Sequence, residues 1–188
     1  FGQKCGIPIK TANYSSEDGT FNSDNEYLTI INTARVKRMD LLEYYDSRQN
    51  ILDIERGTLF LLAEELERYK KEKGLKDFTD LLEDFIAKSL PGSLEVLFID
   101  EAQDLSLIQW EMVRHLWKYA KKTYIAGDDD QAIFKWAGAD VDHFIALKEE
   151  VNDIKVLDQS YRIPGGPIHE LSQKIINKVQ NRFEKEYK

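Results

Sequence analysis

The feature that most constrains this fold is a short apolar run that ends in a cluster of acids and amides. Residues 96–99 (VLFI) are followed directly by residues 100–104 (DEAQD). Such a run predicts a buried strand, and a parallel sheet buries both faces of its strands. Open α/β sheets bind ligands at the carboxyl ends of their strands. The adjacent carboxylates of Asp100 and Glu101 are therefore candidates for holding magnesium and activating water at a phosphate.

The same arrangement recurs twice further along the chain. Residues 123–126 (TYIA) predict a second strand, which leads into residues 127–140 (GDDDQAIFKWAGAD). Residues 154–157 (IKVL) predict a third strand, which leads into residues 158–164 (DQSYRIP). One crevice at one edge of a parallel sheet would collect all three sets of polar side chains.

The N-terminal part of the chain has mainly helical patterns. Residues 1–26 are rich in loop-forming types, and residues 28–38 fit either a helix or a strand. Apolar residues recur at helical spacing over residues 59–69, and Gly74 is a typical stop for that helix. Residues 78–86 carry an apolar face in the i, i+3, i+4, i+7 pattern. The patterns up to Gly74 predict a helical subdomain from residue 1 to about residue 76, and the helix over residues 78–86 belongs to the part that follows.

The remainder of the chain combines strands with helices. Ser106 and Gln109 match a capping box, so a helix is expected between the first two predicted strands. A strand, a helix and a second strand in succession favour a parallel sheet. A last helix is expected over residues 167–186, where apolar residues again have helical spacing. The predicted fold class is therefore α/β.

Taken together, four of these segments resemble motifs of the UvrD/Rep/PcrA family of superfamily 1 DNA helicases. Residues 100–104 resemble the family's Walker B motif, DExQD. Residues 127–139 resemble its GDxDQxIYxWRGA segment, and residues 157–162 its LxQNYR segment. Residues 77–82 (DFTDLL) resemble the DFxDLL stretch that precedes Walker B. Four motifs in the right order are a specific signal, whereas an acid pair after one strand is a weak one.

The resemblance implies a domain arrangement in which one part, the phosphate loop, is missing from this chain. Residues 77–188 would form the C-terminal part of the first RecA-like domain, a partial parallel sheet with flanking helices, and residues 1–76 a helical insert. No G-x-x-x-x-G-K-[ST] occurs in the chain, so the phosphate loop is missing. We therefore expect an internal fragment of a longer helicase, with negligible ATP hydrolysis by itself. Its partners would include the phosphate-loop segment and the second RecA-like domain.

The resemblance also implies ATP and Mg²⁺ as cofactors and assigns catalytic roles to particular residues. Asp100 would be the magnesium partner, and Glu101 would orient or deprotonate the attacking water. Gln131 would sense the γ-phosphate. Tyr161 would pack on the adenine ring, and Arg162 would reach the γ-phosphate. A correctly placed arginine contributes roughly 10³–10⁵ in rate by stabilising transition-state charge.

A DNA contact is implied for the second motif. The family stacks a single-stranded base on the tryptophan that matches Trp136, and base stacking tolerates any sequence. Phe134 stands where the family has tyrosine, so the ring is kept and a hydroxyl contact is lost. Ala137 replaces an arginine and Ser160 an asparagine of the family pattern. The DNA partners implied are single strands and junctions of single-stranded with double-stranded DNA.

Each of these assignments has a simpler alternative. The acids after the first strand could cap the next helix, and a tyrosine and an arginine before a proline could form a surface turn. Trp136 could be a core residue. The acids at 128–130 are interpreted here as structural, because short acidic side chains suit tight turns and helix N-caps.

Composition further restricts the classes of function that this chain can have. The net charge of −8 and a pI near 5.0 argue against broad, nonspecific DNA binding by this chain. Cys5 is the one cysteine, which excludes an internal disulfide, and no apolar stretch is long enough to cross a membrane. We expect a cytoplasmic or nucleoid-associated location. A noncatalytic DNA-binding or regulatory module, or the motor part of a helicase–nuclease, are the alternatives to an ATP-dependent DNA helicase.

Overall fold

The structure is a computed structural model, and it describes residues 13–14, 21–22, 25–48, 54–163, 165–183 and 185. The chain divides into two compact units, each made of two stretches of sequence. Unit 1 runs to Leu97 and resumes over Ser106–Thr123, and unit 2 comprises Phe98–Leu105 and the chain from Tyr124 onwards. The expected division into a helical insert over residues 1–76 and part of a RecA-like domain over residues 77–188 stays a prediction.

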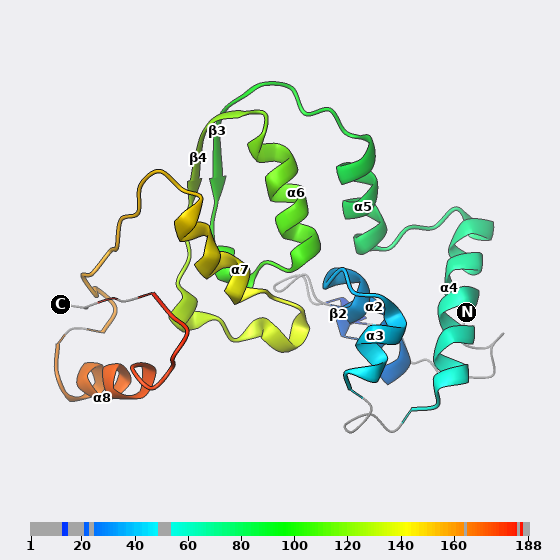
Figure 1. The fold of residues 1–188 in the computed structure, drawn as a ribbon, viewed down its shortest axis with the longest axis horizontal. Coiled ribbons are helices and arrows are strands. Elements are labelled where there is room, and N and C mark those ends of the chain that lie inside the picture. The colour runs from blue at the N-terminus through cyan, green and yellow to red at the C-terminus, as the bar shows by residue number, and fades with distance from the viewer. Residues whose placement is uncertain are drawn as a thin grey trace. The chain divides into compact units, whose positions relative to one another are not determined.

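Unit 1 is mainly helical. Its helices are α2 (Glu26–Val36), α3 (Leu41–Asp46), α4 (Arg56–Lys73), α5 (Phe78–Lys88) and α6 (Leu107–Trp117) (Figure 1). The first three bury a common apolar core, in which Leu59 and Leu62 of α4 are almost fully enclosed. The helical alternative for residues 28–38 is thereby the correct one. No helix among the described residues is both long and apolar enough to span a membrane.

Local capping signals set the helix boundaries in unit 1. The Asp77 side chain accepts a hydrogen bond from the Asp80 amide, and the Asp80 side chain accepts one from the Asp77 amide, so α5 begins with a capping box. Gly74 ends α4 in the left-handed conformation, with φ of 63°, which glycine adopts without a Cβ clash. Ser106 and Gln109 form the predicted capping box of α6.

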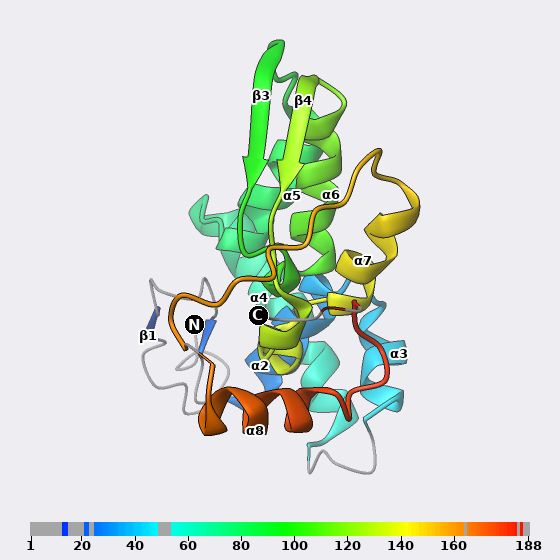
Figure 2. The ribbon, with the colours of Figure 1, turned by 90° about the vertical axis from the view of Figure 1, so that its left-hand side faces the viewer.

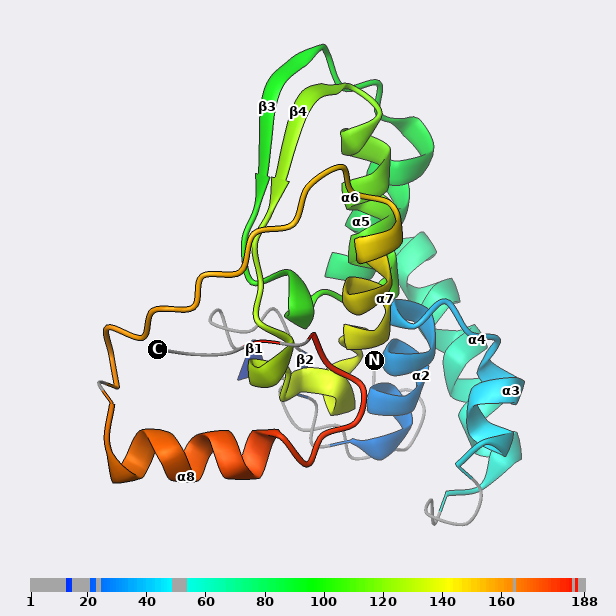
Figure 3. The ribbon, with the colours of Figure 1, turned by 60° about the vertical axis from the view of Figure 1, so that its left-hand side comes forward.

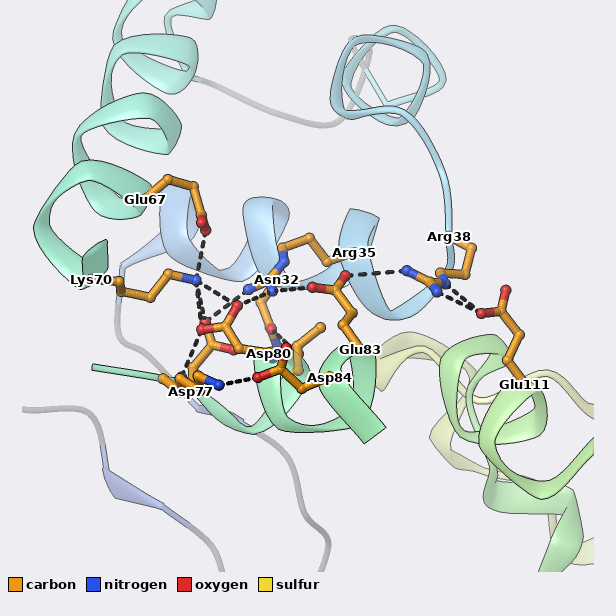
Figure 4. Close-up of polar contacts among 12 residues, drawn as sticks. Asn32, Arg35, Arg38, Glu67, Lys70, Asp77, Asp80, Glu83, Asp84 and Glu111 are labelled. Carbon is orange, nitrogen blue, oxygen red and sulfur yellow. Dashed lines mark hydrogen bonds and ion pairs between the residues drawn. The ribbon is translucent and has the colours of Figure 1, made fainter. Parts of the chain in front are cut away.

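The two aspartates of the DFTDLL segment lie among cations from α2 and α4 (Figure 4). Arg35 of α2 pairs with Asp77 at 2.8 Å and with Asp80 at 2.5 Å. Lys70 of α4, which is buried, donates to Asp77 at 3.0 Å and to Asp80 at 2.9 Å. These acids therefore hold three helices of unit 1 together.

Two small sheets are present among the described residues. β1 (Asn13–Tyr14) pairs antiparallel with β2 (Phe21–Asn22), within a region expected to be irregular. β3 (Leu94–Ile99) and β4 (Ala120–Ile125) form the second sheet, in which both strands run in the same direction (Figures 1 and 2). The predicted parallel sheet and its strand–helix–strand unit are thus confirmed, because α6 lies between these strands in sequence.

The expectation that the first strand is buried on both faces is wrong. Phe98 is 74% exposed, and its ring stacks on that of Tyr124 with centroids 5.1 Å apart. These two rings lie side by side because β3 and β4 are adjacent parallel strands. No other described strand joins this sheet, and Tyr124 is exposed as well.

The third predicted strand is also absent. Residues 151–160 form neither helix nor strand, and the chain crosses from η4 (Leu147–Glu149) to α8 (Pro167–Ile176) without regular structure (Figure 3). Apolar and β-branched residues favour a strand only where a neighbouring strand accepts their backbone hydrogen bonds. Ile154 and Leu157 lie exposed instead.

The C-terminal helix is shorter than the apolar spacing predicts. α8 ends at Ile176, whereas a helix was expected up to residue 186. Residues beyond α8 make ion pairs and hydrogen bonds with acids at 128–130, which a continuing helix would not allow. Tertiary contacts therefore override the helical spacing at this end.

Candidate functional site

The first acidic loop leaves the end of β3 with a strained backbone. Glu101 has φ of 49° and ψ of 41°, a left-handed conformation that few residues other than glycine adopt. Such a conformation costs about 1–3 kcal/mol and persists only where neighbouring contacts enforce it. Here the Glu101 amide donates to the Asp100 side chain at 3.0 Å, and the Ala102 amide donates to the Ala126 carbonyl at 3.0 Å. The two acids are therefore held beside the end of β4.

A buried glutamine connects this loop with the second one. Gln103 is 1% exposed, and its Nε2 donates to Glu101 Oε2 at 2.9 Å and to Asp104 Oδ2 at 3.1 Å. Its Oε1 accepts a hydrogen bond from the Asp128 amide at 2.9 Å. Buried amides need such partners, because an unsatisfied one is costly. No separate role was predicted for Gln103, although its place within the DEAQD segment was a signal for one.

Close approach of the two loops depends on a glycine before Asp128. A Cβ atom at Gly127 would lie 2.7 Å from Oε1 of Gln103 and 2.9 Å from the ring of Phe144. Real Cβ contacts are essentially never that short. Gly127 is therefore required by packing, because any side chain would push Gln103 away from the Asp128 amide.

The second loop turns back at Asp128 and presents Gln131. The residues after Asp128 form η2 (Asp129–Gln131), and the Asp128 side chain caps this turn by accepting from the Asp130 amide. Its Oδ2 also accepts from Gln131 Nε2 at 2.6 Å. Burial alone would raise the pKa of Asp128, but hydrogen bonds from Lys185 and Gln131 hold that pKa below its ordinary value. Asp128 is therefore a charged hydrogen-bond acceptor for Gln131.

A continuous series of hydrogen bonds thus joins Glu101 to Gln131. It runs from Glu101 to Gln103, from Gln103 to Asp128, and from Asp128 to Gln131. Its two ends are exposed, and so is Asp100, whereas Gln103 in the middle is buried. We call this series the Glu101–Gln131 relay. It brings two of the three predicted clusters together at the end of the parallel sheet.

Trp136 lies on the surface in η3 (Phe134–Ala137). Its side chain is 64% exposed, which excludes the alternative of a core tryptophan. Phe134 is half-buried in the same turn, and its carbonyl accepts from the Ala139 amide at 3.2 Å. The exposed indole therefore follows Gln131 by five residues on one short, ordered segment.

The third predicted cluster is not joined to the relay. Tyr161 and Arg162 lie in a bend after the irregular segment, and Tyr161 is 90% exposed. Among the described residues, neither side chain forms a hydrogen bond or an ion pair. Their roles in nucleotide binding stay predictions.

The fold and this site define an α/β protein whose candidate ligand site lies at the carboxyl ends of adjacent parallel strands. Residues 9–152 match the family described as the UvrD/REP helicase N-terminal domain, and the chain belongs to that family.

Similar proteins include ATP-dependent DNA helicases. The chain is 33% identical over 82 residues to the ATP-dependent DNA helicase Rep of Escherichia coli, covering 43% of this chain and 12% of Rep. It is 32% identical over 97 residues to the ATP-dependent DNA helicase PcrA of Staphylococcus epidermidis, covering 46% of this chain and 13% of PcrA. It is 33% identical over 118 residues to the RecBCD enzyme subunit RecB of Buchnera aphidicola, covering 55% of this chain and 9% of RecB. The chain thus spans only a small part of the length of these relatives.

Proposed function

We propose that the protein containing this chain is an ATP-dependent DNA helicase, which couples ATP hydrolysis to translocation on DNA and to its unwinding. The observation that carries the proposal is the Glu101–Gln131 relay, which connects the Walker B acid to the second motif. Residues 77–188 would be the C-terminal part of its first RecA-like domain, and residues 1–76 a helical insert. Family membership and the names of the relatives support the same activity.

The acids fit a magnesium–nucleotide complex. Magnesium prefers oxygen ligands, keeps several waters, and is held through one or two carboxylates plus substrate phosphates. Asp100 offers one exposed carboxylate, and the described residues contain no group of three or more side chains that would hold a metal by themselves. When bound, the ion would neutralise charge on the phosphates. Asp100 is therefore the residue proposed to hold it.

Glu101 and Gln131 supply the chemistry at the attacking water. A carboxylate accepts a proton or orients a water, and a glutamine amide donates and accepts at once. Because the relay joins both side chains, a change at the γ-phosphate that moves Gln131 would be transmitted to Glu101. Tyr161 and Arg162 are proposed to complete the site by contacting the adenine and the γ-phosphate.

DNA would bind next to this machinery. The exposed indole of Trp136 offers a flat surface for a single-stranded base, and such stacking contributes about 1–3 kcal/mol per base. Phe134 supports the same turn. Because Gln131 and Trp136 share one short segment, the affinity for single-stranded DNA would change with the bound nucleotide. Single-stranded DNA and its junctions are the proposed partners.

Similarity to RecB favours a second candidate function. A motor that works as one subunit of a larger enzyme would use the same relay. The relay favours a hydrolytic protein over a noncatalytic module, because a module that has lost hydrolysis need not keep the acid and amides of this site.

Replacement of Glu101 tests the proposal. In the full-length protein, Glu101→Gln should lower DNA-stimulated ATP hydrolysis by about 10²–10⁴-fold, because a general base of this kind contributes that much. Nucleotide affinity, measured by equilibrium binding, should stay within about threefold of the wild type. The exposed Glu149 provides a matched control, Glu149→Gln, which should leave both quantities unchanged. Loss of nucleotide binding in Glu101→Gln would instead mark the residue as structural.

A further inference from the structure

The turn that carries Gln131 is clasped by residues from the end of the chain. We call Arg182, Phe183 and Lys185 the C-terminal clip. Lys185 Nζ lies 2.6 Å from Asp128 Oδ1 and 3.3 Å from Asp130 Oδ2, and it also contacts the Asp129 carboxylate. One ammonium group is therefore shared among three consecutive aspartates.

A second cation and a backbone amide complete the clasp. Arg182 donates from Nε to Asp130 Oδ1 at 2.8 Å and from Nη2 to Asp130 Oδ2 at 2.6 Å. This two-point geometry fixes the carboxylate in orientation as well as in distance. The Phe183 amide donates to Asp129 Oδ2 at 2.7 Å, so each of the three aspartates has a partner from the clip.

The clip is enclosed. The side chain of Lys185 is 9% exposed and that of Asp129 is 2% exposed. The ring of Phe183 contacts the buried Phe144 edge to face, with centroids 5.9 Å apart. Exposed ion pairs are weak because water screens them, whereas a buried charge that loses its partner is strongly disfavoured. These pairs therefore constrain the turn.

Asp128 passes this constraint to Gln131. Its Oδ1 accepts from Lys185 and its Oδ2 accepts from Gln131 Nε2, both at 2.6 Å. Without Lys185 the Oδ1 atom of Asp128 would keep only the Asp130 amide, at 3.2 Å, so the carboxylate would be held less firmly as the acceptor for Gln131. Lys185 is protonated at neutral pH. Burial by itself would lower its pKa, but hydrogen bonds from its ammonium to Asp128 and Asp129 raise that pKa above its usual value.

We propose that Lys185 and Arg182 are positioning residues for ATP hydrolysis, which act by holding the Asp128–Gln131 turn so that Gln131 faces the γ-phosphate. This inference rests on the proposed function, and it assigns a role to a part of the chain outside the recognised motifs. Neither residue touches the reacting atoms; Lys185 acts through Asp128, and Arg182 through Asp130.

Steady-state kinetics of the full-length protein test the proposal. Lys185→Met removes the charge and keeps the length of the side chain. It should lower kcat for DNA-stimulated ATP hydrolysis by at least about tenfold, because small displacements of a positioning group are costly. The KM for ATP should change by less than about threefold, since ground-state binding is not removed. Lys185→Arg should restore most of the activity, and Lys148→Met, at an exposed lysine of η4, should behave as the wild type.

A double variant distinguishes a positioning role of Lys185 from a general loss of protein stability. If Lys185 acts through Asp128, then Lys185→Met combined with Asp128→Asn should have the same kcat as the worse single variant. Multiplied losses, no rescue by arginine, or an unchanged kcat in Lys185→Met would each overturn the proposal.

Hydrogen exchange keeps this test separate from that of the proposed function. In the same full-length proteins, backbone amides of residues 128–131 should exchange faster in Lys185→Met than in Lys148→Met, and Lys185→Arg should restore protection. If the wild type does not hydrolyse ATP, the proposed function fails. The exchange rates of these amides would still show whether the clip holds the turn. Unchanged exchange in Lys185→Met would refute the clip on its own.

Discussion

Oε1 of Gln103 accepts a hydrogen bond from the backbone amide of Asp128 at 2.9 Å, across 25 positions of sequence. The same side chain donates to Glu101, so one buried amide sets the spacing between the two acidic loops. A residue that performs no chemistry thus decides whether the reacting groups of this site lie together.

Gln103→Ala should disconnect the two loops. The Asp128 amide would lose its buried acceptor, which costs about 1–3 kcal/mol in free energy of unfolding. ATP hydrolysis by the full-length protein should fall with little change in the affinity for single-stranded DNA. Thermal unfolding and ATPase assays measure the two effects. Gln180→Ala, at an exposed glutamine, is the matched control and should stay within about 0.5 kcal/mol of the wild type.

Gly127→Ala should be harmful although it adds a single methyl group. The new Cβ would lie 2.7 Å from Gln103 Oε1 and 2.9 Å from the ring of Phe144, so one of them must move. Overpacking of this kind destabilises proteins by about 1–3 kcal/mol, and here it also displaces the relay. Gly92→Ala is the control, because a Cβ there meets nothing within 4 Å. Equal unfolding temperatures for the two variants would contradict the packing argument.

Trp136→Ala should weaken binding of single-stranded DNA and leave nucleotide affinity unchanged. Loss of one stacked base removes about 1–3 kcal/mol, which corresponds to roughly 5–150-fold in Kd. Fluorescence anisotropy with a labelled oligonucleotide measures this change. Tyr124→Ala removes another exposed aromatic ring, on β4, and should have no such effect. Unaltered DNA affinity in Trp136→Ala would rule out base stacking at this residue.

The stability of unit 1 should fall in acid through Asp80. Burial by itself would raise the pKa of Asp80, but hydrogen bonds from Lys70, the Asp77 amide and Arg35 hold it below its ordinary value of 3.8. A carboxyl with a lower pKa in the folded state stabilises the fold above its unfolded pKa, and the stabilisation is lost as the pH falls through the folded pKa.

Thermal unfolding between pH 6 and pH 2 checks this expectation. Asp80→Asn should be less stable than the wild type near neutral pH, and the difference should shrink as the pH falls below about 4. Glu72→Gln, at an exposed position of α4, should show no such convergence. A difference between Asp80→Asn and wild type that is constant with pH would mean that the ion pairs do not stabilise the fold.

Short-range signals in the sequence predicted much of this structure. The capping boxes at Asp77 and Ser106 and the stop at Gly74 are interactions between residues at most four positions apart, so local residue types decide them. The pairing of β3 with β4 also followed from a strand–helix–strand pattern. The DEAQD and GDDDQ segments were identified as site candidates for the same reason, since their residue types occur together.

Tertiary structure decided what depends on distant partners. A strand at residues 154–157 needed a neighbouring strand to accept its hydrogen bonds, and none is present among the described residues. Helix α8 ends at Ile176, before the clip residues that contact the aspartates. Gln103 and Lys185 reach Asp128 from 25 and 57 positions away. The sequence by itself determined which residues are chemically able to serve the site and where its local elements begin. Only the folded chain decided which of them meet, because contacts between distant residues depend on the packing of the segments that carry them.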